Sequence, residues 1–243
     1  MVAQDWELKP MRECEQGKLS LVNEKIVDLF DIKSEDINAW TIAWSLSQTN
    51  RYNGQTPVPW DVLSHTAMCY SLYLSDHKEP NPTTALAILL HDASEAFLGD
   101  IIHPLKMLPA MAWYSELEDS ITQTIFERFG LDWQTIDWKT IKEYDYLSVK
   151  HELHWLKPTT NEHEFFRFTE TPVARFRKLG KAQPWEYIPI LKEAAEHFGA
   201  KDIEALFDIP VILKPYLEHT EKTVEEVSIP APRDSADVDN MRV

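Results

Sequence analysis

The sequence has few cysteines and no long hydrophobic run. Cys14 and Cys69 are its two cysteines in 243 residues, too few and too far apart to suggest a disulfide framework. They favour two reduced thiols in a cytoplasmic protein. The first ten residues, MVAQDWELKP, have neither the basic start nor the apolar stretch of a secretory signal. No run of about 18 apolar residues occurs, so we expect no membrane span and no membrane partner.

Basic residues are also scarce. Lysine and arginine total 24 against 40 aspartates and glutamates, which gives a formal net charge of −16. Binding to a long nucleic acid depends on clustered Lys and Arg, so the composition argues against that partner. It leaves room for a small phosphorylated ligand held by one or two basic residues, and it suits a metal site built from carboxylates. Hydrophobic residues make up 44%, enough for the core of one domain of ordinary size, with a second domain possible.

Helical spacing and capping residues predict an all-α fold, with a helical bundle over residues 31–157. Residues 1–30 form an N-terminal segment whose first 22 residues lack periodicity. Residues 158–218 are a C-terminal extension of uncertain structure, in which NEHEFFRFTETPVARF is compatible with a short strand or hairpin. The polar residues 219–243 are expected to be disordered. The predicted helices are 34–49 with Ser34 as N-cap, 60–76, 83–97, 114–129, 138–156 and 189–198.

One predicted helix carries charged residues in an apolar setting. LLHDASEAFLGDI, residues 89–101, contains His91, Asp92 and Glu95. Adjacent helix positions point about 100° apart, so His91 and Asp92 can converge only on an atom between them, and Glu95 lies on the same side. Two carboxylates in a dry site repel unless a cation is present. A divalent metal ion resolves the conflict, and this donor set suits Co, Mn, Zn, Fe or Mg.

Two other helices offer further ligands. His65 lies in VLSHTAMCYSLYL and Asp145 in IKEYDYLSVKHEL. Taken alone, each is more simply a core or surface residue. The nearby HELH, residues 151–154, lacks the two-histidine spacing of a zinc protease and is expected at the surface.

Taken in order, His65, His91-Asp92 and Asp145 resemble the metal ligands of the HD-domain phosphohydrolases. HDASEAFLGDIIHPLK, residues 91–106, resembles the HDxxE…GD…PxK segment of bacterial 5′-deoxynucleotidases. With DINAWTIAWSLSQTNRYNGQT before it and EYDYL after it, the arrangement resembles phage-type HD enzymes that include dATP triphosphohydrolases. The resemblance covers residues 31–157. Ser64 departs from the family, where the first histidine usually sits in an EHS-like context.

The resemblance implies a role for each matching residue. The metal ligands are His65, His91, Asp92 and Asp145, which would hold one divalent ion, with further ions possible on the substrate. Glu95 would orient or deprotonate the attacking water, acting with Asp92 as the catalytic pair. Substrate contacts would come from Arg51 to phosphate, Asp100 to the sugar hydroxyl, Lys106 to phosphate and, as a weaker candidate, Lys150.

The resemblance also implies a reaction. The phage-like features, RYNGQT above all, favour a deoxynucleoside triphosphate cleaved to deoxynucleoside and triphosphate. The alternative is a 5′-deoxynucleotidase that removes phosphate from deoxynucleoside monophosphates, and a second alternative is a non-catalytic nucleotide-binding HD scaffold. We expect a homo-oligomer in the cytoplasm, or in the cytoplasm of a host if the protein is phage-encoded. Base specificity and the identity of the metal are left open.

Overall fold

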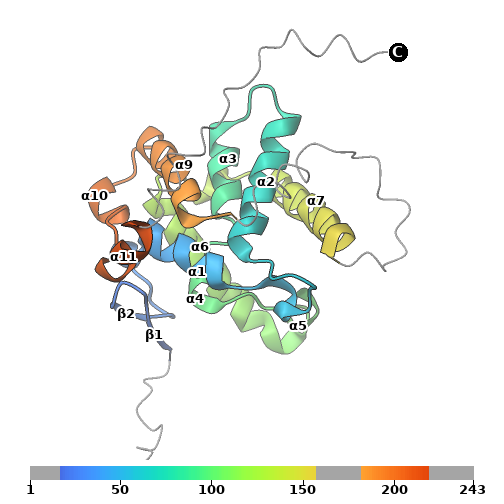
Figure 1. The fold of residues 1–243 in the computed structure, drawn as a ribbon, viewed down its shortest axis with the longest axis horizontal. Helices are drawn as coiled ribbons and strands as arrows, with labels where there is room; N and C mark the ends of the chain where they lie inside the picture. Colours follow the sequence, from blue (N-terminus) through green and yellow to red (C-terminus); the bar gives the residue numbers. More distant parts are fainter. Residues whose placement is uncertain (1–16, 157–181, 219–243) are drawn as a thin grey trace, which may run out of the picture.

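The computed structural model describes residues 17–156 and 182–218, and this part of the chain is mostly helical, which confirms the all-α class (Figure 1). Cys14, the predicted strand or hairpin within NEHEFFRFTETPVARF and the tail from residue 219 lie outside the described residues. The longer helices are α1 (Ala39–Gln48), α2 (Val62–Asp76), α3 (Pro82–Leu90), α6 (Ala112–Arg128), α7 (Trp138–Leu156) and α9 (Pro184–His197). The short ones are α4 (Glu95–Leu98), α5 (His103–Lys106), α10 (Ile203–Leu206) and α11 (Lys214–Glu218).

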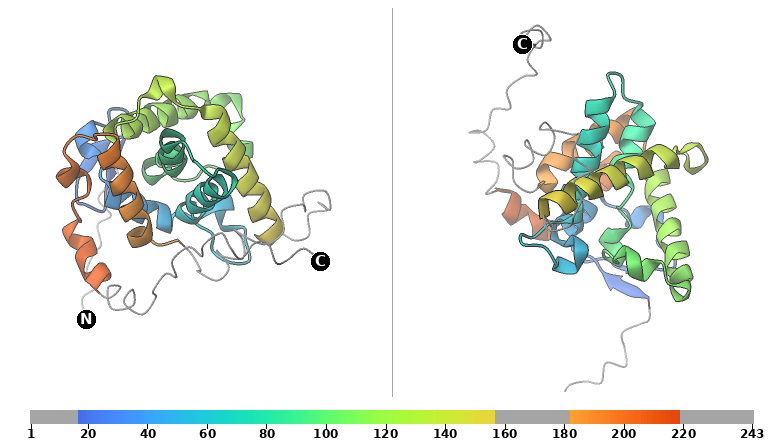
Figure 2. Two further views of the ribbon diagram at one scale, coloured as in Figure 1. Left: turned by 90° about the horizontal axis from the view of Figure 1, so that it is seen from above. Right: turned by 90° about the vertical axis from the view of Figure 1, so that its right-hand side faces the viewer.

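Helix α3 lies near the middle of the bundle and contacts α2, α6, α7 and α9. Seen from above, α7 and α9 run along opposite sides of the α2–α3 pair (Figure 2). This position explains why α3 is apolar on nearly every side, as a buried helix must be. The chain that follows α3 starts inside the bundle, and its polar residues Ser94 and Glu95 are buried.

One hydrophobic core joins the early and the late helices. Ile42 of α1, Leu63 of α2, Leu89 of α3, Phe126 of α6 and Leu191 of α9 are all buried in it. Helix α9 thus packs on the same core as residues 39–156. The guanidinium of Arg128, at the end of α6, donates hydrogen bonds to the carbonyls of residues 201 and 202 and holds the start of α10 against α6.

Although the first 22 residues lack a periodic pattern in the sequence, those from residue 17 on, which the structure describes, include a strand. Strand β1 (Lys18–Ser20) pairs antiparallel with β2 (Ile26–Asp28). Val27 is buried and belongs to the hydrophobic core. A three-residue strand gives too short a pattern for alternation to be detected in the sequence.

The prediction of Ser34 as the N-cap of the first long helix is wrong. Ser34–Asp36 form a separate 3-10 turn, and α1 begins after Asn38, whose side chain accepts a hydrogen bond from the Thr41 amide at 2.9 Å. The Asn38 amide donates to the carbonyl of Asp208 at 2.9 Å. A contact from 170 positions away thus helps to fix the start of α1, and no local pattern reports it.

The predicted continuous helix 83–97 is interrupted. Helix α3 ends at Leu90, and the backbone tightens to bonds between residues three apart, from Ala93 to Leu90 and from Glu95 to Asp92, both 3.0 Å. The freed carbonyls take other donors: that of Ile88 accepts from the His91 ring, and that of Leu89 accepts from the Tyr187 hydroxyl of α9. His91 and Asp92 therefore lie in the turn that joins α3 to α4.

Helix α9 begins at Pro184, five residues before the predicted start. Pro184 occupies its first turn, and the Gln183 amide donates to the Glu186 carboxylate at 3.0 Å. Pro189 lies inside the helix on its exposed side. Among the described residues, none of the helices combines the length and the apolar character needed to cross a bilayer.

Candidate metal centre

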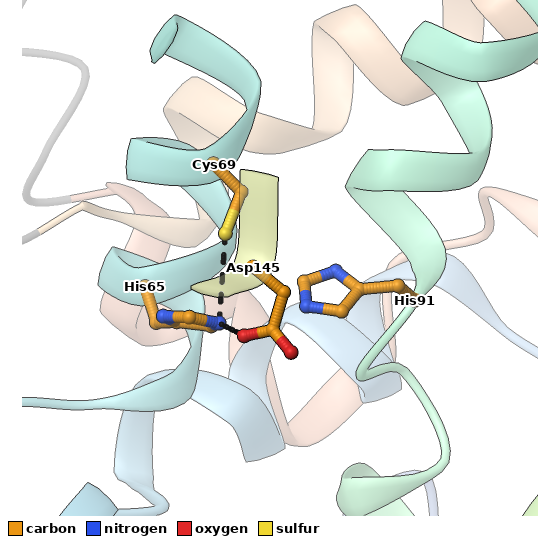
Figure 3. A group of neighbouring side chains, drawn as sticks. All are labelled: His65, Cys69, His91 and Asp145. Carbon is orange, nitrogen blue, oxygen red and sulfur yellow. Dashed lines mark hydrogen bonds and ion pairs between the residues drawn. The ribbon is translucent and has the colours of Figure 1, made fainter. Parts of the chain in front are cut away.

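Three elements bring the candidate ligands together. His65 and Cys69 lie one turn apart on the same face of α2, His91 follows the end of α3, and Asp145 projects from α7 (Figure 3). Asp92 comes directly after His91. Helix α2 contacts both α3 and α7, so the site forms where the three meet. His65 is fully buried, whereas the side chain of Asp145 is 41% exposed. The cluster is therefore enclosed on the His65 side and reaches solvent on the Asp145 side.

The two ring nitrogens of His65 face different partners. Nδ1 lies 2.7 Å from Oε1 of Glu152, a carboxylate on α7. Nε2 lies 3.1 Å from Oδ1 of Asp145 and 3.5 Å from Oδ2 of Asp92. A histidine whose Nδ1–H donates to a carboxylate keeps its Nε2 lone pair for a metal ion. His65 has the partner that a metal ligand of this kind requires.

His91 has the same arrangement with a backbone acceptor. Its Nδ1 lies 2.8 Å from the carbonyl oxygen of Ile88. Its buried Nε2 has no hydrogen-bond partner among the described residues, although it lies 3.3 Å from Asp92 Oδ2. An unpartnered buried nitrogen is costly, and a cation at this point would satisfy it.

The structure contains a group of four side chains that could hold a metal ion: one donor atom from each of His65, Cys69, His91 and Asp145, all within 4.8 Å of one another. Donors on one metal ion lie at comparable separations, because each sits about 2.0 to 2.3 Å from the ion. Cys69 Sγ lies 3.5 Å from His65 Nε2. Asp92 contacts both imidazoles from beside this group. The donor set of imidazole, carboxylate and thiol fits a borderline divalent cation.

The charges of the cluster reinforce this assignment. Burial alone would lower the pKa of His91, but Asp92 raises it to about 10. Burial would raise the pKa of Asp92, but His91, His65 and Arg51 hold it well below its usual range. The pKa of Asp145 is also lowered, against the effect of burial, by its hydrogen bond with His65. In the absence of metal, the negative carboxylates thus favour protonated imidazoles. A divalent cation would balance the negative charge of the carboxylates in place of those protons.

Arg51, predicted to bind phosphate, lies beside the cluster. Its Nη1 is 3.5 Å from Asp92 Oδ2 and its Nε is 3.3 Å from Glu152 Oε2. Burial would lower the pKa of the guanidinium, but Glu152 and Asp92 raise it well above its ordinary value. Arg51 therefore stays charged next to the metal ligands.

Glu95, predicted to act on water, is buried in the turn that follows His91-Asp92. Its Oε1 lies 3.5 Å from the Lys106 ammonium, and its buried Oε2 has no hydrogen-bond partner in the described part of the chain. Burial, then Asp92 and Asp100, raise the pKa of Glu95 well above its ordinary value. Lys106 also contacts Glu118, at 2.7 Å. Asp100 and Lys106 thus lie close enough to Glu95 to shift its pKa, Asp100 upward and Lys106 downward.

Lys150 is placed differently. Its ammonium lies 4.2 Å from the centre of the exposed Tyr146 ring, one turn earlier on α7. Such a contact is typical of a cation resting on an aromatic face. Its assignment to substrate stays a prediction.

Sequence reasoning missed Cys69, a member of the cluster, and Glu152, which contacts His65. Taken by itself Cys69 predicts only a reduced thiol, but its position four residues after His65 on one helix indicates that the two side chains share a face. Glu152 lies in HELH, which was expected at the surface, yet its side chain is 0% exposed. Its helical position, seven residues after Asp145, would put both on one face of α7.

Comparisons with known proteins leave the activity open. No family model matches the sequence. The chain is 34% identical over 113 residues to an uncharacterized protein of Rhodobacter capsulatus, a match that covers 46% of this chain and 57% of the relative. It is 34% identical over 100 residues to the uncharacterized protein YfdR of Escherichia coli K12, with 41% and 51% covered. The chain therefore spans little more than half the length of the curated relatives it matches.

Proposed function

We propose that this chain is a metal-dependent phosphohydrolase of the HD-domain type that acts on a deoxynucleotide. The observation that carries the proposal is the pair of imidazoles, His65 and His91, whose Nδ1 atoms have acceptors while their Nε2 atoms face Asp145 and Asp92. Two histidines whose Nδ1 atoms are engaged and whose Nε2 atoms lie beside two ionised aspartates are suited to coordinate a divalent cation. The nucleotide substrate comes from the resemblance of residues 31–157 to HD enzymes.

The donor set favours certain metals. Imidazole and thiol donors suit Zn, Co and Fe, whereas carboxylates alone would suit Mg. A bound divalent cation lowers the pKa of a water molecule and polarises a phosphoryl oxygen. We therefore propose a borderline cation such as Co, Zn, Fe or Mn for this site.

The chain's own residues supply the remaining chemistry. Glu95 is buried, has an oxygen without a hydrogen-bond partner among the described residues and has a raised pKa; a carboxylate with these properties is suited to take the proton of the attacking water. Arg51 presents a planar guanidinium beside Asp92, suited to bind two phosphoryl oxygens at once. Phosphoryl transfer depends chiefly on such positioning and charge neutralisation.

The ion pairs around the site favour a monophosphate over a triphosphate substrate. Arg51 and Lys106, the basic side chains that contact Asp92 and Glu95, are each already paired with two carboxylates: Arg51 with Asp92 and Glu152, and Lys106 with Glu95 and Glu118. A triphosphate brings more negative charge, and it would need further cations to bind it. We therefore favour the 5′-deoxynucleotidase reaction. Triphosphate hydrolysis, which the RYNGQT segment suggested, stays the second candidate.

The deciding experiment incubates the purified protein, loaded with Mn or Co, with each deoxynucleoside mono- and triphosphate. Release of orthophosphate from a monophosphate supports the favoured reaction, and release of inorganic triphosphate supports the second candidate. Binding of a nucleotide without turnover would identify the chain as a scaffold. Asp92→Ala should abolish either reaction, whereas Asp119→Ala, at an exposed aspartate on α6, should leave it unchanged.

A further inference from the structure

Glu152 is a fully buried carboxylate with four donors. Oε1 accepts from the Trp60 indole at 2.8 Å and lies 2.7 Å from His65 Nδ1. Oε2 accepts from the Tyr52 hydroxyl at 2.5 Å and from Arg51 Nε at 3.3 Å. An ionised carboxylate has about four acceptor positions, so every one is used. Burial would raise its pKa, but His65 and Arg51 lower it to about 2.

The four donors come from parts of the chain about 90 to 100 residues away from Glu152. The loop between α1 and α2 is closed by backbone hydrogen bonds from Arg51 to Trp60, 2.8 Å, and from Val62 to Thr49, 3.0 Å. Within it, Tyr52 has a positive φ of 57°, a conformation that costs a non-glycine residue energy. The strained loop directs three of its side chains at one carboxylate.

We infer that Glu152 is a positioning residue that holds a metal ligand with one oxygen and the phosphate-binding arginine with the other. Through Oε1 it orients the His65 imidazole, and through Oε2 it orients the Arg51 guanidinium. Retention of the cation and binding of phosphate would then depend on the same buried anion. The inference rests on the proposed function for the role of Arg51, but the effect on metal binding is independent of catalysis.

The test compares Glu152→Gln, Glu152→Asp and the wild-type chain by metal affinity, measured with Co²⁺ or Zn²⁺ in competition with a chromophoric chelator. Glutamine keeps the volume but loses the charge and turns an NH₂ group toward two donors. Aspartate keeps the charge but is smaller. If Glu152 acts by its charge, Glu152→Gln should weaken metal affinity by about 10- to 100-fold, and Glu152→Asp should weaken it less. If Glu152 only fills space, the order reverses, because the smaller residue leaves a cavity.

Ser148→Ala is the matched control, since Ser148 is buried one turn earlier on α7 and its hydroxyl has no hydrogen-bond partner among the described residues. It should bind the metal as the wild type does. A proton NMR signal from His65 Nδ1–H, shifted far downfield by the carboxylate, is expected in the wild type even if Glu152→Gln fails to fold. Its absence from the wild type would overturn the inference.

The same variants separate this inference from the proposed function. If the wild type hydrolyses no deoxynucleotide but Glu152→Gln still loses metal affinity, the positioning role stands and the function fails. If the wild type is active and Glu152→Gln binds metal normally with an unchanged KM, the function stands and the positioning role is refuted.

Discussion

Replacing Glu95 with glutamine tests the assignment of the general base. The side chain is 4% exposed, and Glu95→Gln keeps its shape while removing its ability to take a proton. Its Oε1 faces Lys106 at 3.5 Å, and burial together with Asp92 and Asp100 raises its pKa. A raised pKa makes Glu95 a stronger base than an ordinary glutamate.

The expected loss in kcat is about 10²- to 10⁴-fold, the usual contribution of a positioned base. At about 1.36 kcal/mol for each factor of ten, this corresponds to about 2.7 to 5.4 kcal/mol of transition-state stabilisation. Wild-type kcat should rise with pH as Glu95 loses its proton, and this limb should be missing in the variant. Because burial penalises the charged form, the metal-free variant should also be more stable than the metal-free wild type above the ordinary glutamate pKa.

The assay is steady-state hydrolysis of the preferred deoxynucleotide at saturating Mn, over a range of pH, with metal content measured on the same samples. Glu116→Gln, at an exposed glutamate on α6, serves as the matched control and should be fully active. If Glu95→Gln keeps more than about a tenth of the activity, or if its activity is lost only because metal is lost, Glu95 is not the base.

Three further predictions concern the metal site. A cation held at 100 times its Kd should stabilise the fold by about 2.7 kcal/mol, and thus raise Tm by about 5 to 11 °C; an unchanged Tm in differential scanning calorimetry would count against the site. The pKa of His91 is raised to about 10 from an ordinary 6.5. The protonated imidazole therefore stabilises the metal-free fold fully below pH 6.5, and this stabilisation is lost as the pH rises toward 10. Denaturant titrations should show the decline in the free energy of unfolding, and His91→Gln should remove it. The Co²⁺-loaded protein should show a sulfur-to-cobalt charge-transfer band that disappears in Cys69→Ser and persists in Cys14→Ser; a wild type without the band would exclude the thiol as a ligand.

The residues that the sequence located most easily are those whose signal is local. His91, Asp92 and Glu95 stand out because charged groups in an apolar helix need a partner, and the structure does bring His65 and Asp145 to His91 and Asp92. The helix break at His91 was missed. The Leu89 carbonyl that the break frees accepts from the Tyr187 hydroxyl, 98 positions away, and such a contact leaves no local signal in the sequence.

Glu152 shows the same limit more sharply. Within HELH it resembles any polar residue of an amphipathic helix, and only its spacing of seven residues from Asp145 relates it to the site. Its four donors lie on α2 and on the loop before it, so only the fold reveals that they share one acceptor. Cys69 is the contrasting case, since its spacing from His65 was visible in the sequence and only its chemistry was overlooked.

The most direct test of the central claim is an equilibrium titration of the metal-free protein with Co²⁺ or Zn²⁺, followed by metal analysis. The account predicts one tightly bound divalent ion per chain. It also predicts that His91→Gln loses that ion, because Nε2 of the wild-type His91 faces the cluster without a hydrogen-bond partner in the described part of the chain. A wild type that binds no metal, or a His91→Gln variant that binds it as tightly as the wild type, would contradict the account.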